Sequence, residues 1–117
     1  MKLSVQEGGA KIPKTLKKVI DKTLGETSLG FVPDGATIEK IEVAIRTGFN
    51  GASATIDIGD ADDDDAYMDN TDITEATPAS YVVYPNALMT ADTEILITMG
   101  GTVGTTGDAT VLLTYTV

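Results

Sequence analysis

The sequence of 117 residues contains no cysteine, no histidine and no tryptophan. Without cysteine, neither a disulfide nor a thiolate metal site can form. Without histidine, the chain lacks the usual general base and the commonest metal ligand. No apolar run approaches the roughly 18 residues that cross a bilayer, and the first residues lack the apolar core of a signal peptide. We therefore expect a soluble single domain that is made in the cytoplasm.

Basic residues are confined to the first part of the chain. All eight lie at or before Arg46, whereas twelve of the eighteen acidic residues follow it. This asymmetry predicts a basic N-terminal arm, residues 1–16, on a single acidic domain, residues 17–117. It reflects either drift in composition or an arm that docks on an acidic neighbour. The candidate docking residues are Lys11, Lys14, Lys17 and Lys18. The acidic domain repels nucleic acid and anionic membranes, so neither is an expected partner.

Alternating apolar and polar residues predict strands along most of the chain. Ile41, Val43 and Ile45 share one face of a predicted strand over residues 37–47. Asn50-Gly51 follows it, and this dipeptide is the strongest short signal for a hairpin turn. We therefore predict that residues 37–47 and 52–59 form one hairpin. Further strands are expected to end at residue 32 and to cover residues 80–84, 93–99 and 109–117.

The segment from residue 14 to residue 24 fits two patterns. Its apolar residues fall on one helical face, and Pro13 and Gly25 stand where a helix begins and ends. Residues 19–24 also read as a strand, and the β-like sequence downstream favours that reading. The seven or eight short strands, together with eighteen threonines, predict an all-β antiparallel β-sandwich.

Seven aspartates lie between Gly59 and Asp72 without one lysine or arginine. Asp60, Asp62 and Asp64 have the 1-3-5 spacing that opens a calcium loop. An EF-hand needs glycine at its sixth position and glutamate at its twelfth, and this chain has Asp65 and Thr71 there. These departures favour a solvated loop without a cofactor, and calcium remains the alternative.

No pattern in the sequence indicates an enzyme. A glycosidase pair needs one carboxyl group in an apolar pocket, which a run of exposed aspartates does not provide. The glycine-rich residues 100–108 fit no phosphate-binding motif. Among the aromatic residues, Tyr115 is expected in the core. Tyr67, Tyr81 and Tyr84 are candidates for contacts with a partner or a glycan, and Tyr67 is expected to anchor the acidic loop.

Two stretches of the sequence resemble a group of small virion proteins of tailed phages. They are VPDGATIEKIEVAIRTGFNGASATIDIGDADDDDAYM and TEILITMGGTVGTTGDATVLLTYTV. The shared features are a Pro-x-Gly turn, an alternating strand, a Phe-Asn-Gly turn, an acidic stretch that ends in an aromatic, and a closing strand after a Gly/Thr loop. The resemblance covers roughly residues 30–117 and rests on turn residues rather than on a catalytic motif.

The resemblance implies a jelly-roll-like β-sandwich in the virion, commonly a homotrimer. One implied role is a head decoration, or cement, protein that binds the major capsid protein or another virion protein. The alternative is a tail-tip or head-fibre knob that binds a host-surface glycan or protein. Such a protein would be made in the host cytoplasm, and fold alone does not decide between the roles.

Overall fold

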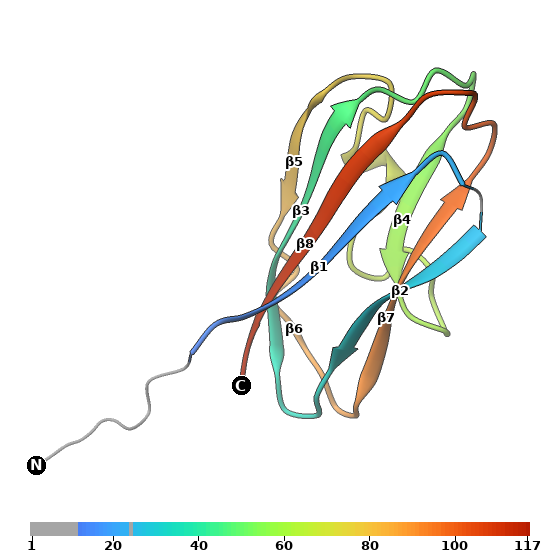
Figure 1. Ribbon diagram of the computed structural model, residues 1–117. Helices are drawn as coiled ribbons and strands as arrows, with labels where there is room; N and C mark the ends of the chain where they lie inside the picture. Colours follow the sequence, from blue (N-terminus) through green and yellow to red (C-terminus); the bar gives the residue numbers. More distant parts are fainter. Residues whose placement is uncertain (1–11, 24) are drawn as a thin grey trace, which may run out of the picture.

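The chain folds as a sandwich of two antiparallel β-sheets, as the alternating sequence predicts. The computed structural model describes residues 12–23 and 25–117 (Figure 1). The five-stranded sheet has the order β1 (Lys14–Asp21), β8 (Asp108–Thr116), β3 (Thr37–Thr47) and β5 (Ala79–Val83), and β6 (Ala87–Leu88) also pairs with β3. The three-stranded sheet has the order β2 (Gly25–Val32), β7 (Thr93–Gly100) and β4 (Thr55–Gly59).

The order of the strands is that of a jelly roll. Strands β1 to β4 alternate between the two sheets, and β7 and β8 then insert between strands made earlier. Strands β5 and β6 pair with successive parts of β3 in one antiparallel direction. They therefore form a single edge strand that is interrupted at Pro85 and Asn86, where Asn86 has a φ of 49°. The expected jelly-roll-like sandwich is confirmed.

Period-two burial builds the core between the sheets. From Ile41 to Ile45 of β3 and from Ala109 to Tyr115 of β8, every second side chain is buried, and the residues between them face outward. The largest fully buried side chains include Phe49, Ile38, Ile41, Ile56, Ile58, Met68, Ile95, Ile97 and Leu113. Each such side chain stabilises the fold by about 1.5–3 kcal/mol. Tyr115, which is 8% exposed, belongs to this core as expected.

The predicted hairpin of residues 37–47 and 52–59 is wrong. Both strands exist, but β3 pairs with β8 and β5 while β4 pairs with β7 in the other sheet. The connection between them crosses from one sheet to the other, because Phe49 is fully buried. A two-residue turn would have left this aromatic side chain outside the core.

Asn50 holds the crossover against a distant loop instead of forming a hairpin turn. Its Oδ1 accepts hydrogen bonds from the backbone N–H groups of Thr105 at 2.8 Å and Thr106 at 3.2 Å. Gly51 donates its N–H to the carbonyl of Val103 at 3.1 Å. A Cβ atom at Gly51 would lie 1.8 Å from the carbonyl oxygen of Thr102, so only glycine fits there. The dipeptide therefore joins two loops.

The N-terminal part of the described chain is a strand, as the β-like sequence downstream suggested. β1 begins at Lys14 and pairs with β8 over its whole length. Residues 14–16, which the sequence assigned to the arm, belong to this strand. The rest of the predicted arm, including Lys11, lies outside the described residues except for residues 12 and 13. At the other end, the strand expected over residues 109–117 ends at Thr116, and Val117 is 56% exposed.

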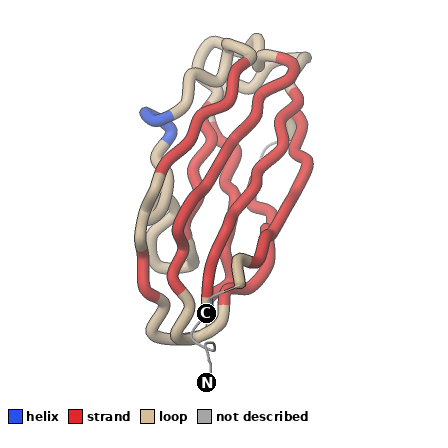
Figure 2. Tube along the Cα trace, turned by 90° about the vertical axis from the view of Figure 1, so that its left-hand side faces the viewer, coloured by secondary structure: helices blue, strands red, loops and turns tan. Residues whose placement is uncertain are grey.

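No helix in residues 12–23 and 25–117 is long and apolar enough to cross a membrane. The helical element of this part is the short 3₁₀ turn η1 (Asn70–Asp72), drawn in blue beside the red strands in Figure 2.

We expect Asn50→Ala to lower the free energy of unfolding by about 1 kcal/mol, because two backbone N–H groups lose their acceptor. Asn50→Asp keeps an acceptor oxygen and should cost less. Urea unfolding followed by circular dichroism measures both changes. Equal stability of Asn50→Ala and the unchanged protein would contradict the assigned role of this side chain.

Candidate functional site: the acidic segment and the lysine edge

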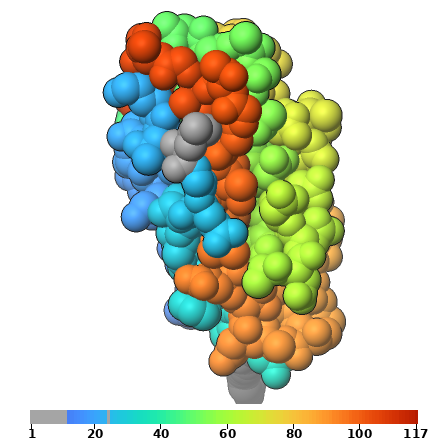
Figure 3. Space-filling view, turned by 90° about the vertical axis from the view of Figure 1, so that its right-hand side faces the viewer, coloured from blue at the N-terminus to red at the C-terminus, as the bar shows by residue number. Residues whose placement is uncertain are grey.

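Residues 59–72, the acidic segment, form an ordered loop along the outer side of β4 (Figure 3). Asp60 organises its first half, because one carboxylate oxygen accepts the backbone N–H groups of Asp62 and Asp63, each at 3.0 Å. The other oxygen accepts the hydroxyl of Tyr67 at 2.8 Å. These hydrogen bonds are the kind with which aspartate stabilises tight turns. The carboxylate of Asp60 is therefore used to fold the loop.

Met68 joins the acidic segment to the sandwich. Its side chain is 1% exposed, and its backbone exchanges two hydrogen bonds with Ile58 of β4, at 2.9 and 3.0 Å. This single bridge occupies the place where a fourth strand would pair with β4. Tyr67, beside it, is partly buried. Desolvation and the hydrogen bond to Asp60 raise the pKa of Tyr67 to about 12. The loop is thus anchored by Met68 and Tyr67 together.

The carboxylates that converge are not the predicted trio. Among the described residues, Asp57, Asp65 and Asp69 bring one carboxylate oxygen each within 4.8 Å of one another, and Asp63, Asp64 and Asp65 form a second group. Neither Asp60 nor Asp62 belongs to these groups. Sequence spacing missed Asp57 because it lies on β4, where its position between Ile56 and Ile58 turns it outward toward the loop.

The crowding of the carboxylates changes the pKa values of two of them. Hydrogen bonds with the side chains of Asp63 and Asp69, together with their negative charge, raise the pKa of Asp65 to about 6. The pKa of Asp69 is lowered, first because the backbone N–H of Thr71 donates to it and then because Asp65 does. Asp69 is also the N-cap of η1, with its oxygen 2.9 Å from that N–H. The segment therefore holds an excess of negative charge that its own hydrogen bonds do not remove.

Four lysines mark the opposite side of the sandwich. Lys14, Lys17 and Lys18 lie on β1 and Lys22 follows it, and all four residues are exposed. We call β1 with Lys22 the lysine edge. Within residues 12–23 and 25–117, none of these lysines forms an ion pair. The ion pairs of this part are Lys40–Glu42 at 3.9 Å and Arg46–Asp108 at 2.8 Å.

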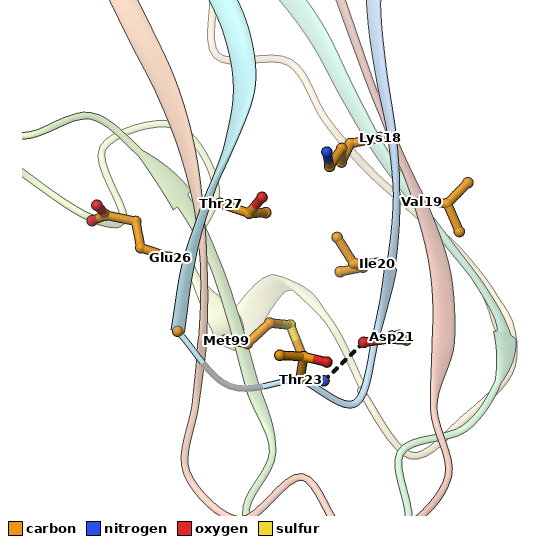
Figure 4. A pocket seen from close by; sticks show the side chains of 9 residues that line it. Lys18, Val19, Ile20, Asp21, Thr23, Glu26, Thr27 and Met99 are labelled. Atoms are coloured by element: carbon orange, nitrogen blue, oxygen red, sulfur yellow. Dashed lines mark hydrogen bonds between the residues drawn. The ribbon is translucent and has the colours of Figure 1, made fainter.

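A pocket of about 270 Å³ separates the lysine edge from β2 (Figure 4). Lys18 and Ile20 point toward it, whereas Val19 points away and is 55% exposed. The backbone N–H of Thr23 donates to Asp21 at 2.9 Å and closes the turn at its end. The side chains of β1 therefore extend to both sides of the strand, as alternation requires.

The three candidate tyrosines have different surroundings. Besides Tyr67, Tyr81 packs against the core, and its hydroxyl donates to the carbonyl groups of Thr74 and Thr77 at 3.1 and 2.9 Å. Tyr84 is 69% exposed between β5 and β6. The structure does not unite these three side chains in one described pocket. Sequence patterns alone did not separate them, because the burial of each ring depends on how the strands and loops pack around it.

The described basic residues and the exposed apolar residues gather on one sheet. The six described basic residues all belong to β1, β3 or the turn after β1, and β2, β4 and β7 have none. Of the exposed large hydrophobic residues, only Phe31 belongs to the three-stranded sheet. The others lie on or directly beside the five-stranded sheet: Ile12, Val19, Val82, Tyr84, Leu88 and Val117.

No protein-family model and no curated protein matches this sequence. Solved structures match the fold, among them the following two. A chain of the capsid asymmetric unit of cyanophage Pam1 has a TM-score of 0.75 and 17% identity, covering 96% of this chain and 89% of that one. A chain of the acid-stable capsid of Helicobacter pylori bacteriophage KHP30 has a TM-score of 0.75 and 14% identity, with 92% of both chains covered.

This chain shares its fold with chains of two phage capsids. The coverage is nearly complete in both directions. At this level of identity the likeness concerns the fold. It agrees with the resemblance that the turn residues and strands indicated.

The raised pKa of Asp65 predicts how stability depends on pH. Between the ordinary value of 3.8 and about 6, the folded chain binds more protons than the unfolded chain. The contribution of Asp65 to stability is therefore present below pH 3.8 and is lost as the pH rises through about 6. We expect Asp65→Asn to be more stable than the unchanged protein at pH 7 and to lose less stability between pH 4 and 6. Thermal melting across this range tests it, with Asp62→Asn as the matched control. An unchanged pH profile in Asp65→Asn would contradict the raised pKa of Asp65.

Proposed function

We propose that this chain is a non-enzymatic structural protein of a phage virion, which decorates and stabilises the capsid as a homo-oligomer. The observation that carries the proposal is the nearly full-length match to chains of two phage capsids at a TM-score of 0.75. The resemblance in turn residues and in the Gly/Thr loop, found in the sequence independently, supports it.

The surface chemistry supports a structural role. The acidic side chains outside the core include exposed Asp62 and Asp64, which lack the apolar surroundings that tune a catalytic carboxyl group. Burial is the main cause that raises the pKa of Glu75. The Glu75 carboxylate accepts a hydrogen bond from the backbone N–H of Ile56 at 3.1 Å. That hydrogen bond assigns Glu75 to holding β4 in place. A durable β-sandwich whose carboxyl groups serve solubility and folding suits a particle component that is made in many copies.

The two faces of the sandwich suggest how the protein is oriented on a particle. The three-stranded sheet has acidic residues and no basic residue on its strands, for example Glu26, Asp57 and Glu94. The five-stranded sheet has basic and exposed apolar side chains. We infer that the latter sheet is turned toward other virion proteins, among them the major capsid protein, and that the acidic sheet is turned toward solvent. Like charge on the outside keeps particles apart.

Purified protein added to phage heads that lack it tests the proposal. We expect it to sediment with DNA-filled heads in a fixed ratio and to raise the temperature at which they release DNA. An unrelated acidic protein of similar size is the control. The alternative role, a tail-tip or head-fibre knob with exposed Tyr84 in its contact surface, predicts binding to tails or host cells. Failure to bind heads would overturn the decoration role.

We propose that the acidic segment acts as a solvated, negatively charged surface without a bound ion. Millimolar calcium should then move the melting temperature no further than sodium at equal ionic strength. A calcium site at 100 times its dissociation constant would add about 2.7 kcal/mol and raise the melting temperature by several degrees. Comparing Asp62→Asn and Asp64→Asn with Asp65→Asn locates any such site. A calcium-specific rise that one of these substitutions abolishes would refute the solvated surface.

A further inference from the structure

The exposed lysines of the lysine edge and the carboxylates of the acidic segment lie on opposite sides of the sandwich. β1 is one edge of the five-stranded sheet, and β5 is the other. η1, at the end of the acidic segment, contacts both β4 and β5, so the segment lies on the side away from β1. Figure 3 shows the same separation, with β1 in blue at one side and the acidic segment in yellow-green at the other. One copy therefore cannot bring its lysine edge to its own acidic segment.

The lysine edge is an edge strand that is paired on one side only, with exposed apolar residues beside its charges. β1 pairs with β8 on one side and with no other described strand. Alternation places Lys17 and Lys18 on opposite faces of this strand, so ammonium groups flank it from both sides. Val19 is 55% exposed and Ile12, just before the strand, is 71% exposed. Lysines on an edge are a known guard against β-pairing, but a guard does not require exposed valine and isoleucine beside it.

The acidic segment offers complementary chemistry. Asp62 and Asp64 are exposed, and their side chains form no hydrogen bond within the described residues. Three carboxylates beside them converge without a basic side chain in an ion pair with them. An ammonium group placed here would relieve their mutual repulsion. Complementary charge of this kind steers association and fixes which surfaces meet.

We propose that the lysine edge of one copy docks against the acidic segment of the next copy, head to tail. This inference rests on the proposed homo-oligomer and names the two surfaces that form its contact. The contact is heterologous, because different surfaces meet, so every added copy leaves one free surface of each kind until the assembly closes as a ring. Three copies related by a threefold axis satisfy all the surfaces and give the homotrimer that the sequence resemblance implied.

Charge reversal tests the contact, with light scattering as the readout at micromolar protein and about 50 mM salt, where exposed charges are weakly screened. Two half variants are made, Lys17→Glu with Lys18→Glu, and Asp62→Lys with Asp64→Lys. We expect each to associate at least about tenfold more weakly than the unchanged chain, because attraction becomes repulsion. The combined variant restores the net charge of −10 and should recover the mass of the unchanged chain.

The matched control is Lys40→Glu with Arg46→Glu, which reverses the charge of two residues on β3. It should leave the molar mass of the assembly unchanged. Circular dichroism confirms that each variant is folded. Mixing the two half variants should produce assemblies that neither forms alone, because opposite surfaces then meet again. Raising the salt to about 500 mM should dissociate the unchanged protein toward the monomer.

Three results would overturn the head-to-tail contact. The first is a monomeric unchanged protein at every accessible concentration, and the second is normal association of both half variants. The third is loss of association in the β3 control alone, which would place the contact on the outer face of the five-stranded sheet. Binding to heads is measured separately with the unchanged protein. If that binding succeeds while the charge reversals have no effect, the capsid role stands and only the contact is wrong.

Discussion

The sandwich depends on β8 being held between β1 and β3. Its inward side chains enter the core, and its backbone pairs on both sides, in register with β1 from Lys14 to Asp21 and with β3 from Thr37 to Thr47. The order of the five-stranded sheet, and with it the separation of β1 from the acidic segment, follows from this placement. Because β8 pairs with one side of β1, the other side of β1 is the free edge of the sheet, and the lysines flank it.

The acidic segment, a charged loop, lies where a further strand would pair with β4. A jelly roll ordinarily closes its second sheet with a fourth strand, and here a single bridge at Met68 remains at that position. The rest of the segment turns back on itself through the carboxylates of Asp60 and Asp69. The edge of β4 is thus covered by a loop whose surface repels other acidic edges, which protects it from unwanted pairing. The same loop supplies the negative half of the proposed contact.

Alternation along the sequence predicted the strands well, because burial of every second residue is a local consequence of a sheet with one face in the core. It identified residues 37–47 as a strand with the bounds that the structure shows. It failed on their partner, because Asn50-Gly51 is a local turn signal and the burial of Phe49 is a long-range one. Similarly, composition located the aspartates and the lysines, but only the topology brings Asp57 to Asp65 and places Lys17 on an edge.

The insertion of β8 between β1 and β3 also sets an order of events during synthesis. Strands β1 and β3 leave the ribosome early, yet each finds its shared partner only after at least sixty intervening residues have been made. A β1 that waits in this way exposes its backbone to any neighbouring strand, and non-local pairing of this kind is slow. The lysines that flank β1 repel one another between nascent chains, so they also protect an unfinished molecule until its own β8 arrives.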